Sequence, residues 1–505
     1  MTHPVELDDV QGLLRFGYKH HTEACFVLLR VKNRAAARAW LAAAPLTSAV
    51  PAEPPPATVL QLALSSEGLR ALGVPGDIVD AFSPEFVSGM GSDPSRARRL
   101  GDLGANAAQQ WQWGTGARLP HVLLLLYALP GQLEGWQTSI EAQCAVGFDI
   151  LARLPCSDLR GAEPFGFADG LSQPQIDWER SRPAHDAEQL AYSNLGCLGE
   201  FLLGYPNEYG GYTDRPLLDP RRDVNDAKGL LPYDKDAADL LPRAEDAPDQ
   251  LDLGRNGSYL VLRQLRQDVH GFWQWLDRAA EGESARREQL AAALVGRTLQ
   301  GEPLEPLEEG AAHELNAFDY DADPRGTRCP LGAHIRRANP RNADLPPGAP
   351  GLLSWLTRTL GFDAPALDQD RVASTRFHRL LRRGRAYGAE VPLAQALAGP
   401  SDSAETGLYF ICLGANMARQ FEFVQSAWLN SSHFDGLQHE SDPLLGNRLP
   451  APDGAATADF SVPQPGGPDQ RLSGLPQFVS VQGGGYFFLP GIRALRYLAS
   501  QGDPS

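Results

Sequence analysis

The chain has little cysteine for its size. Only six of its 505 residues are cysteine, and no two of them form a Cys-x-x-Cys pair. Six thiols in a chain of this length do not make a disulfide scaffold, so we expect reduced, mostly buried cysteines. The spacing also fails to supply the two ligand pairs of a zinc finger.

A long apolar run is missing as well. The longest, residues 122–129, is far too short to cross a bilayer. The first residues contain neither a basic stretch nor the hydrophobic stretch that comes after it in a secretory leader. From these features we expect no membrane segment, and either a cytoplasmic location or a place as cargo of an internal compartment.

Positive charge is in deficit. The chain carries 45 lysines and arginines against 62 aspartates and glutamates, a formal net charge of −17. Nucleic-acid binding needs a basic face that displaces counterions, so nucleic acid is not an expected partner. An anionic membrane surface is disfavoured for the same reason.

What is present is the composition of a folded protein, 43% hydrophobic and 21% charged, in a chain too long for one core. The first part alternates between strand-like and helix-like patterns. Asn33 and Ser65 are placed to cap two of the helices. The expected strands are 26–31, 59–64 and 122–129, and the expected helices are 35–44, 66–72 and 131–154.

The same outline returns after a loop-rich region at residues 177–256. Expected strands are 258–262, 407–413 and 478–489, and expected helices are 268–279 and 416–428. The repetition favours a duplicated α+β unit with helices against a sheet. A segment rich in proline and glycine, 340–367, is expected to be an inserted loop with a short helix at 352–360.

The first segment that could carry chemistry is Gly166-Phe-Ala-Asp-Gly170. Glycines allow backbone conformations that other residues avoid, and the phenylalanines on either side supply an apolar surround. This arrangement can present Asp169 as a single acid or base in a dry pocket. By itself, the pattern is more typical of an ordinary turn in which Asp169 bonds to the nearby backbone.

The second segment, Cys329 to Arg341, has one histidine followed by three arginines. A neutral imidazole is a common ligand for a single metal, and arginines bind carboxylates in pairs of hydrogen bonds. Haem offers both an iron and two carboxylates, so it would use both features. A buried core histidine, an exposed basic face, or half of a zinc site are the alternatives.

The third segment is residues 378–388, where five cationic or imidazole side chains fall close together. A solvated basic loop is the usual interpretation of such a run. Leu380, Leu381 and Tyr387 indicate that part of the segment packs inward, which would leave one arginine buried and paired.

Together these segments, with the strand and helix at 407–425, resemble the dye-decolorizing peroxidases, a family of haem peroxidases. The resemblance runs from about Val10 to Leu489. It implies an α+β fold of two ferredoxin-like units, of the dimeric α+β barrel type, with antiparallel sheets and the haem in the C-terminal half. The implied boundaries are 1–180 for the first unit, 181–256 for ordered loops, and 257–505 for the second unit with its insertion around 340–370.

The resemblance also implies roles for individual residues. Asp169 corresponds to the distal acid/base and Arg382 to the distal arginine. His334 corresponds to the iron ligand and Arg341 to the arginine that binds a haem propionate. The further residues expected at the cofactor are Arg336, Gly166, Gly170 and Phe421.

The implied activity is a peroxidase with haem b (iron protoporphyrin IX) that reduces hydrogen peroxide and oxidises dyes, phenols or other small aromatic donors. Because a carboxylate base stays charged in acid, an acidic pH optimum is expected. Family members often self-associate, so a homo-oligomer is allowed. The alternative is a protein that binds haem or handles its iron with little peroxidase turnover.

Two features depart from the family pattern. The stretch between His334 and Arg382 is longer than in many members. Some members place an asparagine two residues after the distal arginine, where this chain has Gly384.

Overall fold

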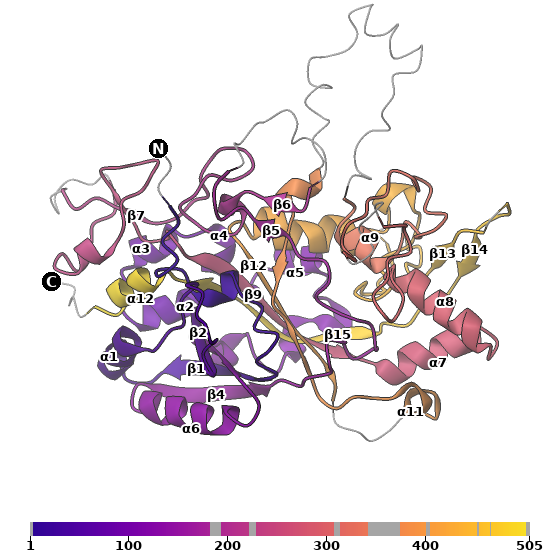
Figure 1. Cartoon of the computed structure of the whole chain (residues 1–505), viewed down its shortest axis with the longest axis horizontal. Coiled ribbons are helices and arrows are strands. Elements are labelled where there is room, and N and C mark those ends of the chain that lie inside the picture. The colour runs from indigo at the N-terminus through magenta and orange to yellow at the C-terminus, as the bar shows by residue number, and fades with distance from the viewer. Residues whose placement is uncertain are drawn as a thin grey trace, which may run out of the picture.

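One large antiparallel sheet runs through the molecule (Figure 1). The computed structural model describes residues 4–181, 193–221, 229–307, 314–341, 374–399, 405–451, 454–464 and 466–500. Within them the 9-stranded sheet has the order β10-β12-β9-β15-β2-β3-β1-β4, with β11 also paired to β12. Its strands are β1 (Glu23–Val31), β2 (Thr58–Leu64), β3 (Val122–Ala128), β4 (Phe148–Pro155), β9 (Ser258–Gln267), β10 (Leu381–Arg382), β11 (Arg385–Tyr387), β12 (Gly407–Gly414) and β15 (Val479–Leu489).

The two halves of the sheet have the same strand order. The first reads β4-β1-β3-β2, and the second reads β15-β9-β12-β10, with β10 and β11 together in the place of a second strand. In each half the fourth strand therefore lies beside the first, and the third lies between the first and the second. This confirms the expected pair of ferredoxin-like units. The halves join where Phe488 of β15 pairs with Leu64 of β2.

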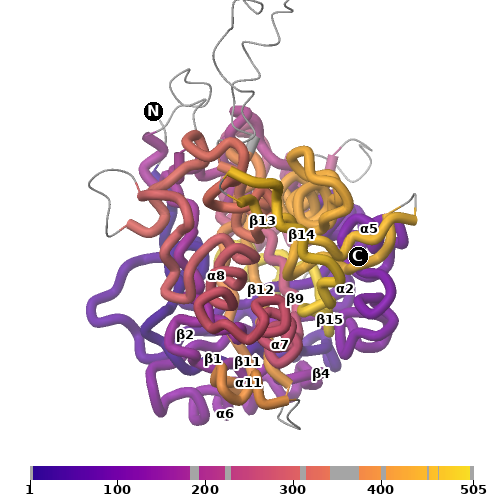
Figure 2. The backbone as a smooth tube through the Cα atoms, turned by 90° about the vertical axis from the view of Figure 1, so that its right-hand side faces the viewer, coloured from indigo at the N-terminus to yellow at the C-terminus, as the bar shows by residue number. Residues whose placement is uncertain are grey.

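Helices pack against this sheet. The longer ones in the first half, α1 and α6, contact each other, while α7 and α8 contact each other in the second half. Figure 2 shows α8 next to the hairpin of β13 (Phe460–Val462) and β14 (Gln470–Leu472). The helices are α1 (Arg34–Ala43), α2 (Ser66–Ala71), α3 (Gly76–Asp80), α4 (Pro84–Ser88), α5 (Pro94–Leu100), α6 (Leu133–Cys144), α7 (Val269–Ala279), α8 (Ser284–Val295), α9 (His334–Ala338), α11 (Leu393–Leu397) and α12 (Ile492–Leu498).

The central strands are buried on both faces. In β1, Val27 and Leu29 belong to one hydrophobic cluster, and Phe26 and Leu28 belong to the cluster on the opposite face. A strand covered on both sides has no polar face, so its sequence is a continuous apolar run and does not alternate. This explains why β1 and β3 stand out in the sequence of the first half.

The expected helix starts are confirmed. The Asn33 side chain accepts a hydrogen bond from the Ala36 amide, and Ser65 accepts one from the Gly68 amide. The expected helix at 416–428 forms as two consecutive wide π-helical turns, Ala418–Glu422 and Val424–Leu429. Its apolar side chains Met417, Phe421, Val424 and Trp428 are buried.

The expected helix at 131–154 is wrong in its second half. Helix α6 ends at Cys144, and β4 comes next as the edge strand beside β1. Gly147 lies in the turn between them. Only glycine fits there, because a Cβ would lie 2.6 Å from the backbone nitrogen of Ala37. Its carbonyl accepts the amides of Lys32 and Asn33. Pairing with a distant strand decides the structure of β4, and the local helical pattern cannot reveal that.

Where the structure describes it, the loop-rich region contains short paired strands. β5 (Gln175–Ile176) pairs with β6 (Leu195–Gly196), and β7 (Leu217–Leu218) pairs with β8 (Leu251–Asp252). The hairpin of the second half is β13 (Phe460–Val462) and β14 (Gln470–Leu472). The short helix expected at 352–360 lies outside the described residues. Among the helices that are described, none has the length and apolar character that a bilayer crossing requires.

The cap of α1 gives a test of the fold. Replacing Asn33 by Ala should lower the free energy of unfolding by about 1 kcal/mol, because the Ala36 amide loses its acceptor. Asn33→Asp is the matched control, since its carboxylate still accepts at a helix N-terminus. Equal unfolding curves for Asn33→Ala and the unmodified chain in urea would contradict the assigned cap.

Candidate functional site

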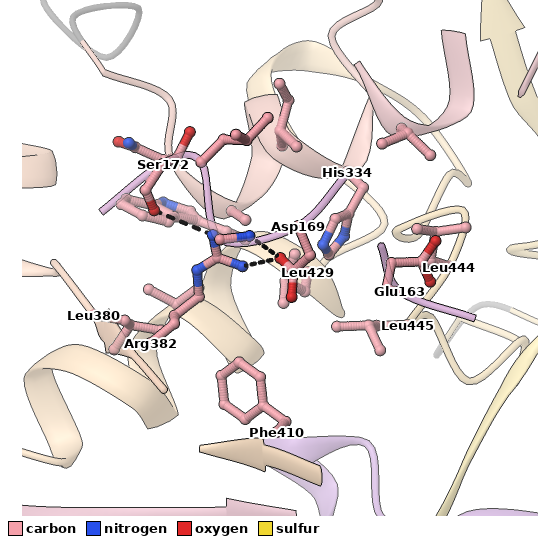
Figure 3. A pocket seen from close by; sticks show the side chains of 18 of the residues that line it. Glu163, Asp169, Ser172, His334, Leu380, Arg382, Phe410, Leu429, Leu444 and Leu445 are labelled. Atoms are coloured by element: carbon pink, nitrogen blue, oxygen red, sulfur yellow. Dashed lines mark hydrogen bonds and ion pairs between the residues drawn. The ribbon is translucent and has the colours of Figure 1, made fainter. Parts of the chain in front are cut away.

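The three segments singled out in the sequence line one cavity. The volume of this cavity, counted as the space open to the centre of a water molecule, is about 280 Å³. Asp169, His334 and Arg382 all line its wall, although they come from a loop, from α9 and from β10 (Figure 3). Most of the remaining wall is apolar, with Leu380, Phe410, Leu429, Leu444 and Leu445 among its side chains.

Asp169 sits in a turn that its glycines shape. Gly166 and Gly170 have φ values of +100° and +72°, which L side chains rarely adopt. The Gly170 amide donates to the Asp169 carboxylate at 2.6 Å. Conformation, more than space, requires glycine here, since an added Cβ would meet nothing closer than 3.8 Å at either position. Gly170 lines the cavity; Gly166 does not.

Arg382 is held against the loop that carries Asp169. Its guanidinium lies 3.3 Å from the Asp169 carboxylate and donates to the carbonyl of Ser172 at 3.1 Å. The Arg382 backbone and the Gln173 side chain exchange hydrogen bonds of 3.0 and 3.1 Å. Cation and carboxylate are therefore fixed relative to each other before anything binds.

The residue two positions after Arg382 has no room for a side chain. A Cβ on Gly384 would lie 2.7 Å from the carbonyl oxygen of Tyr409 in the neighbouring strand. An asparagine would not fit this backbone. The presence of glycine at position 384, where an asparagine was considered from the sequence, is thus a consequence of close strand packing.

His334 points one ring nitrogen at a carboxylate. Its Nδ1 lies 3.0 Å from Asp442, whose side chain is fully buried. Burial alone would raise the pKa of Asp442, but His334 and Arg337 hold that pKa below its ordinary value. An ionised Asp442 keeps the proton on Nδ1, so Nε2 carries a lone pair. A carboxylate at the second nitrogen is the partner that metal-binding histidines commonly have.

A second histidine also lines the cavity. His378 stacks on Phe423 with ring centroids 3.7 Å apart, and its Nδ1 faces the carbonyl of Arg419. Burial lowers the pKa of His378 to about 4. With a stacked ring and no carboxylate partner among its described contacts, His378 is the weaker candidate for a metal ligand.

Two buried arginines line another part of the wall. Arg341 donates to the carbonyls of Asn316 and Phe318 at 3.0 and 2.6 Å. Arg297 donates to two other carbonyls and to the Ser172 hydroxyl, and it has no carboxylate partner in the described part of the chain. Burial, with Arg341 next in effect, lowers the pKa of Arg297 to about 10.

Arg336 lies elsewhere. Its guanidinium pairs with Asp323 at 3.2 Å and covers the ring of Tyr320, and it does not line the cavity. Its neighbour Cys329 is buried, which raises the pKa of that thiol to about 12. Among the described residues no group of three or more possible ligands gathers for a metal ion, at Cys329 or elsewhere. Phe421 does line the cavity.

Sequence reasoning missed several residues of this site. Asp442 and Arg297 lie far from the aspartate motif in the chain and carry no local signature. His378 belongs to the segment 378–388, but the sequence suggested no role for it. A signal was available for Asp442, because a histidine that binds a metal needs an acceptor for its other nitrogen. The sequence could not show which of its many carboxylates fills that role.

Several known proteins are similar to this chain in sequence, although no family model matches it. The multifunctional dye peroxidase DyP2 of an Amycolatopsis species is 29% identical over 461 residues, which cover 87% of this chain and 82% of that protein. Dye-decolorizing peroxidase msp1 of Mycetinis scorodonius is 26% identical, with coverage of 98% and 88%.

Solved structures of such peroxidases are similar to this chain in fold as well. A fungal DyP-type peroxidase from Auricularia auricula-judae matches with a TM-score of 0.71 and 25% identity, covering 99% of this chain and 100% of that one. The alignment therefore spans nearly the whole length of both chains. In sequence and in fold, this chain is therefore similar to the dye-decolorizing peroxidases over nearly its whole length.

Proposed function

We propose that this chain uses haem b to reduce hydrogen peroxide while it oxidises dyes, phenols or other small aromatic donors. The observation that carries the proposal is the fixed Asp169–Arg382 pair in the wall of the same cavity as His334. A haem carrier would need His334 and the arginines. It would have no use for a carboxylate held beside a guanidinium.

The residues present fit haem. His334 offers Nε2, because Asp442 holds the proton on the other nitrogen. Arg297 is a buried cation without a carboxylate among the described residues, and Arg341 lines the same wall. These two arginines suit the two propionates of the cofactor. Arg297 takes the part that the sequence had suggested for Arg336.

The chemistry divides between cofactor and chain. Haem, when bound, supplies the iron at which peroxide is cleaved and the store of oxidising equivalents for the donor. Asp169 would accept the proton from one peroxide oxygen and give it to the other, which leaves as water. Arg382 would stabilise the negative charge that develops on the leaving oxygen.

Steady-state turnover tests the activity. Purified protein loaded with haem should consume peroxide in step with the bleaching of a dye or the oxidation of a phenol. A protein that only carries haem or handles its iron would bind the cofactor and show its absorption band. It would give no sustained, donor-dependent peroxide consumption, and that result would refute the proposal.

Replacing His334 by Ala should remove the cofactor or displace its iron ligand, because no other described histidine of the cavity offers Nε2 with a carboxylate behind it. His378→Gln is the matched control and should leave the absorption spectrum of the bound haem unchanged. Asp442→Asn should weaken cofactor retention by about 10- to 100-fold, as loss of the carboxylate behind a ligating histidine commonly does. A normal ligand spectrum in His334→Ala would overturn the assignment.

Asp169→Asn should slow peroxide activation by about 10²- to 10⁴-fold while haem stays bound, since the variant cannot carry the proton. Stopped-flow mixing with peroxide measures this step directly. Asp158→Asn, a carboxylate outside the cavity wall, serves as the control. A rate within a few fold of the unmodified enzyme would show that another group moves the proton.

An acidic optimum is the expected consequence of a carboxylate base. An ordinary aspartate titrates near pH ~4, whereas a histidine would be protonated below about 6.5. Peroxide activation is therefore expected to persist at pH values where a histidine base would have failed. The rate constant for peroxide activation, measured across the acidic and neutral range, checks this, and a loss of activity with a midpoint near the histidine value would count against Asp169 as the base.

A further inference from the structure

Glu163 lies in the cavity wall, at the start of the loop that carries Asp169. It falls outside the glycine motif, and the proton transfer proposed for Asp169 does not involve it. In the view of Figure 3, Glu163 and Arg382 are drawn on opposite sides of Asp169.

The Glu163 carboxylate binds the backbone of the adjoining turn. One oxygen accepts the Phe167 amide at 3.0 Å, and the other accepts the Phe165 amide at 3.1 Å. The Glu163 backbone amide in turn donates to the carbonyl of Phe167 at 2.9 Å, and its carbonyl accepts the Gly166 amide at 2.8 Å. A single residue thus satisfies the amides of three consecutive residues of the turn.

The second half of the chain holds this arrangement from outside. Gln267, at the end of β9, donates to the Glu163 carboxylate at 2.6 Å. Trp273 of α7 donates its indole N–H to the carbonyl of Phe165 at 3.1 Å. The ring of Phe165 packs on Phe272, with centroids 4.5 Å apart. Glu163 is therefore the point where the loop is tied to β9.

Asp169 is placed by the way this turn closes. Ala162 and Ala168 form an antiparallel bridge across it, and the Asp169 amide donates to the carbonyl of Gly161 at 2.9 Å. The closed turn between Ala162 and Ala168 is the one that Glu163 fills. A change in the turn would move Ala168 and with it the direction of the Asp169 side chain.

We propose that Glu163 is a positioning residue: its carboxylate closes the Phe165–Phe167 turn, ties it to Gln267 and thereby aims Asp169 into the cavity. This inference rests on the proposed role of Asp169 in peroxide activation. It assigns Glu163 no contact with substrate or cofactor.

The surroundings of Glu163 suit a carboxyl group that works in both charge states. Burial, opposed by the hydrogen bonds and assisted by the charge of Asp169, raises the pKa of Glu163 to about 7. The amide oxygen of Gln267 is buried without a hydrogen-bond partner among the described residues. A half-turn of that amide would present the oxygen to a protonated Glu163, so the tie to β9 survives protonation.

A double-mutant cycle separates positioning from general stability. Glu163→Ala should slow peroxide activation by up to about 100-fold, the effect of a misplaced catalytic group. In an Asp169→Asn background the same substitution should have almost no further effect, because the group it aims is already disabled. Equal losses in both backgrounds would show a merely structural role and overturn the proposal.

Conservative variants keep the test valid if Glu163→Ala folds poorly. Glu163→Gln keeps an oxygen that can accept the Phe167 amide, and a flipped Gln267 can accept from its NH2 group. The same NH2 group cannot accept the Phe165 amide, so this variant should recover only part of the rate. Glu141→Gln is the matched control, because Glu141 is also a paired carboxylate, bound to Arg153 at 2.8 Å, but lies outside the cavity wall. Failure of Glu163→Gln to exceed Glu163→Ala would contradict the proposed tie.

A second readout does not depend on activity. Amide hydrogen exchange of Phe165 and Phe167, measured without cofactor, should be at least about tenfold faster in Glu163→Ala than in the unmodified chain, as expected when a hydrogen bond of about 1.4 kcal/mol is lost. If the enzyme shows no peroxide turnover at all, this measurement still decides whether Glu163 holds the turn. Unchanged exchange at both amides would refute the positioning role even if turnover is normal.

Discussion

The hydrogen bonds between Gln173 and Arg382 join the two halves of the chain at the point where the chemistry is expected. Gln173 belongs to the loop that leaves the first ferredoxin-like unit, and Arg382 lies on an edge strand of the second. Neither half could form the Asp169–Arg382 pair alone. The duplicated fold matters here because its two units meet edge to edge in one sheet, which gives the loop a fixed surface to bind.

Positive charge inside the protein is the second constraint. Burial lowers the pKa values of Arg297, Arg337 and Arg448 to about 10 each, and their guanidinium groups bind mainly to carbonyl oxygens. Carbonyls satisfy the N–H groups but do not cancel the charge, so buried cations remain costly. An anionic ligand at Arg297 would offset part of this cost. Binding of such a ligand and stability of the fold are then coupled.

How much of this the sequence could predict depends on the range of the interaction. Strands β1 and β3, the cap at Asn33 and the cavity positions of Asp169, His334 and Arg382 are predictable from local patterns and from the resemblance. Strand β4 is not, because its partner lies more than a hundred residues away. The roles of Asp442, Arg297 and Glu163 also depend on contacts across the fold, which periodicity and spacing do not encode.

Two carboxyl groups near the cavity have opposite electrostatic surroundings. Asp442 is held ionised by His334, Arg337 and the amides of Leu444 and Leu445, whereas burial makes Glu163 neutral below a pH of about 7. In acid, the Asp442 charge therefore persists and keeps the Nδ1 proton of His334 in place. Glu163 loses its charge in the same range, but its carboxyl oxygens can still accept the amides of Phe165 and Phe167, so the turn before Asp169 can stay closed in both charge states.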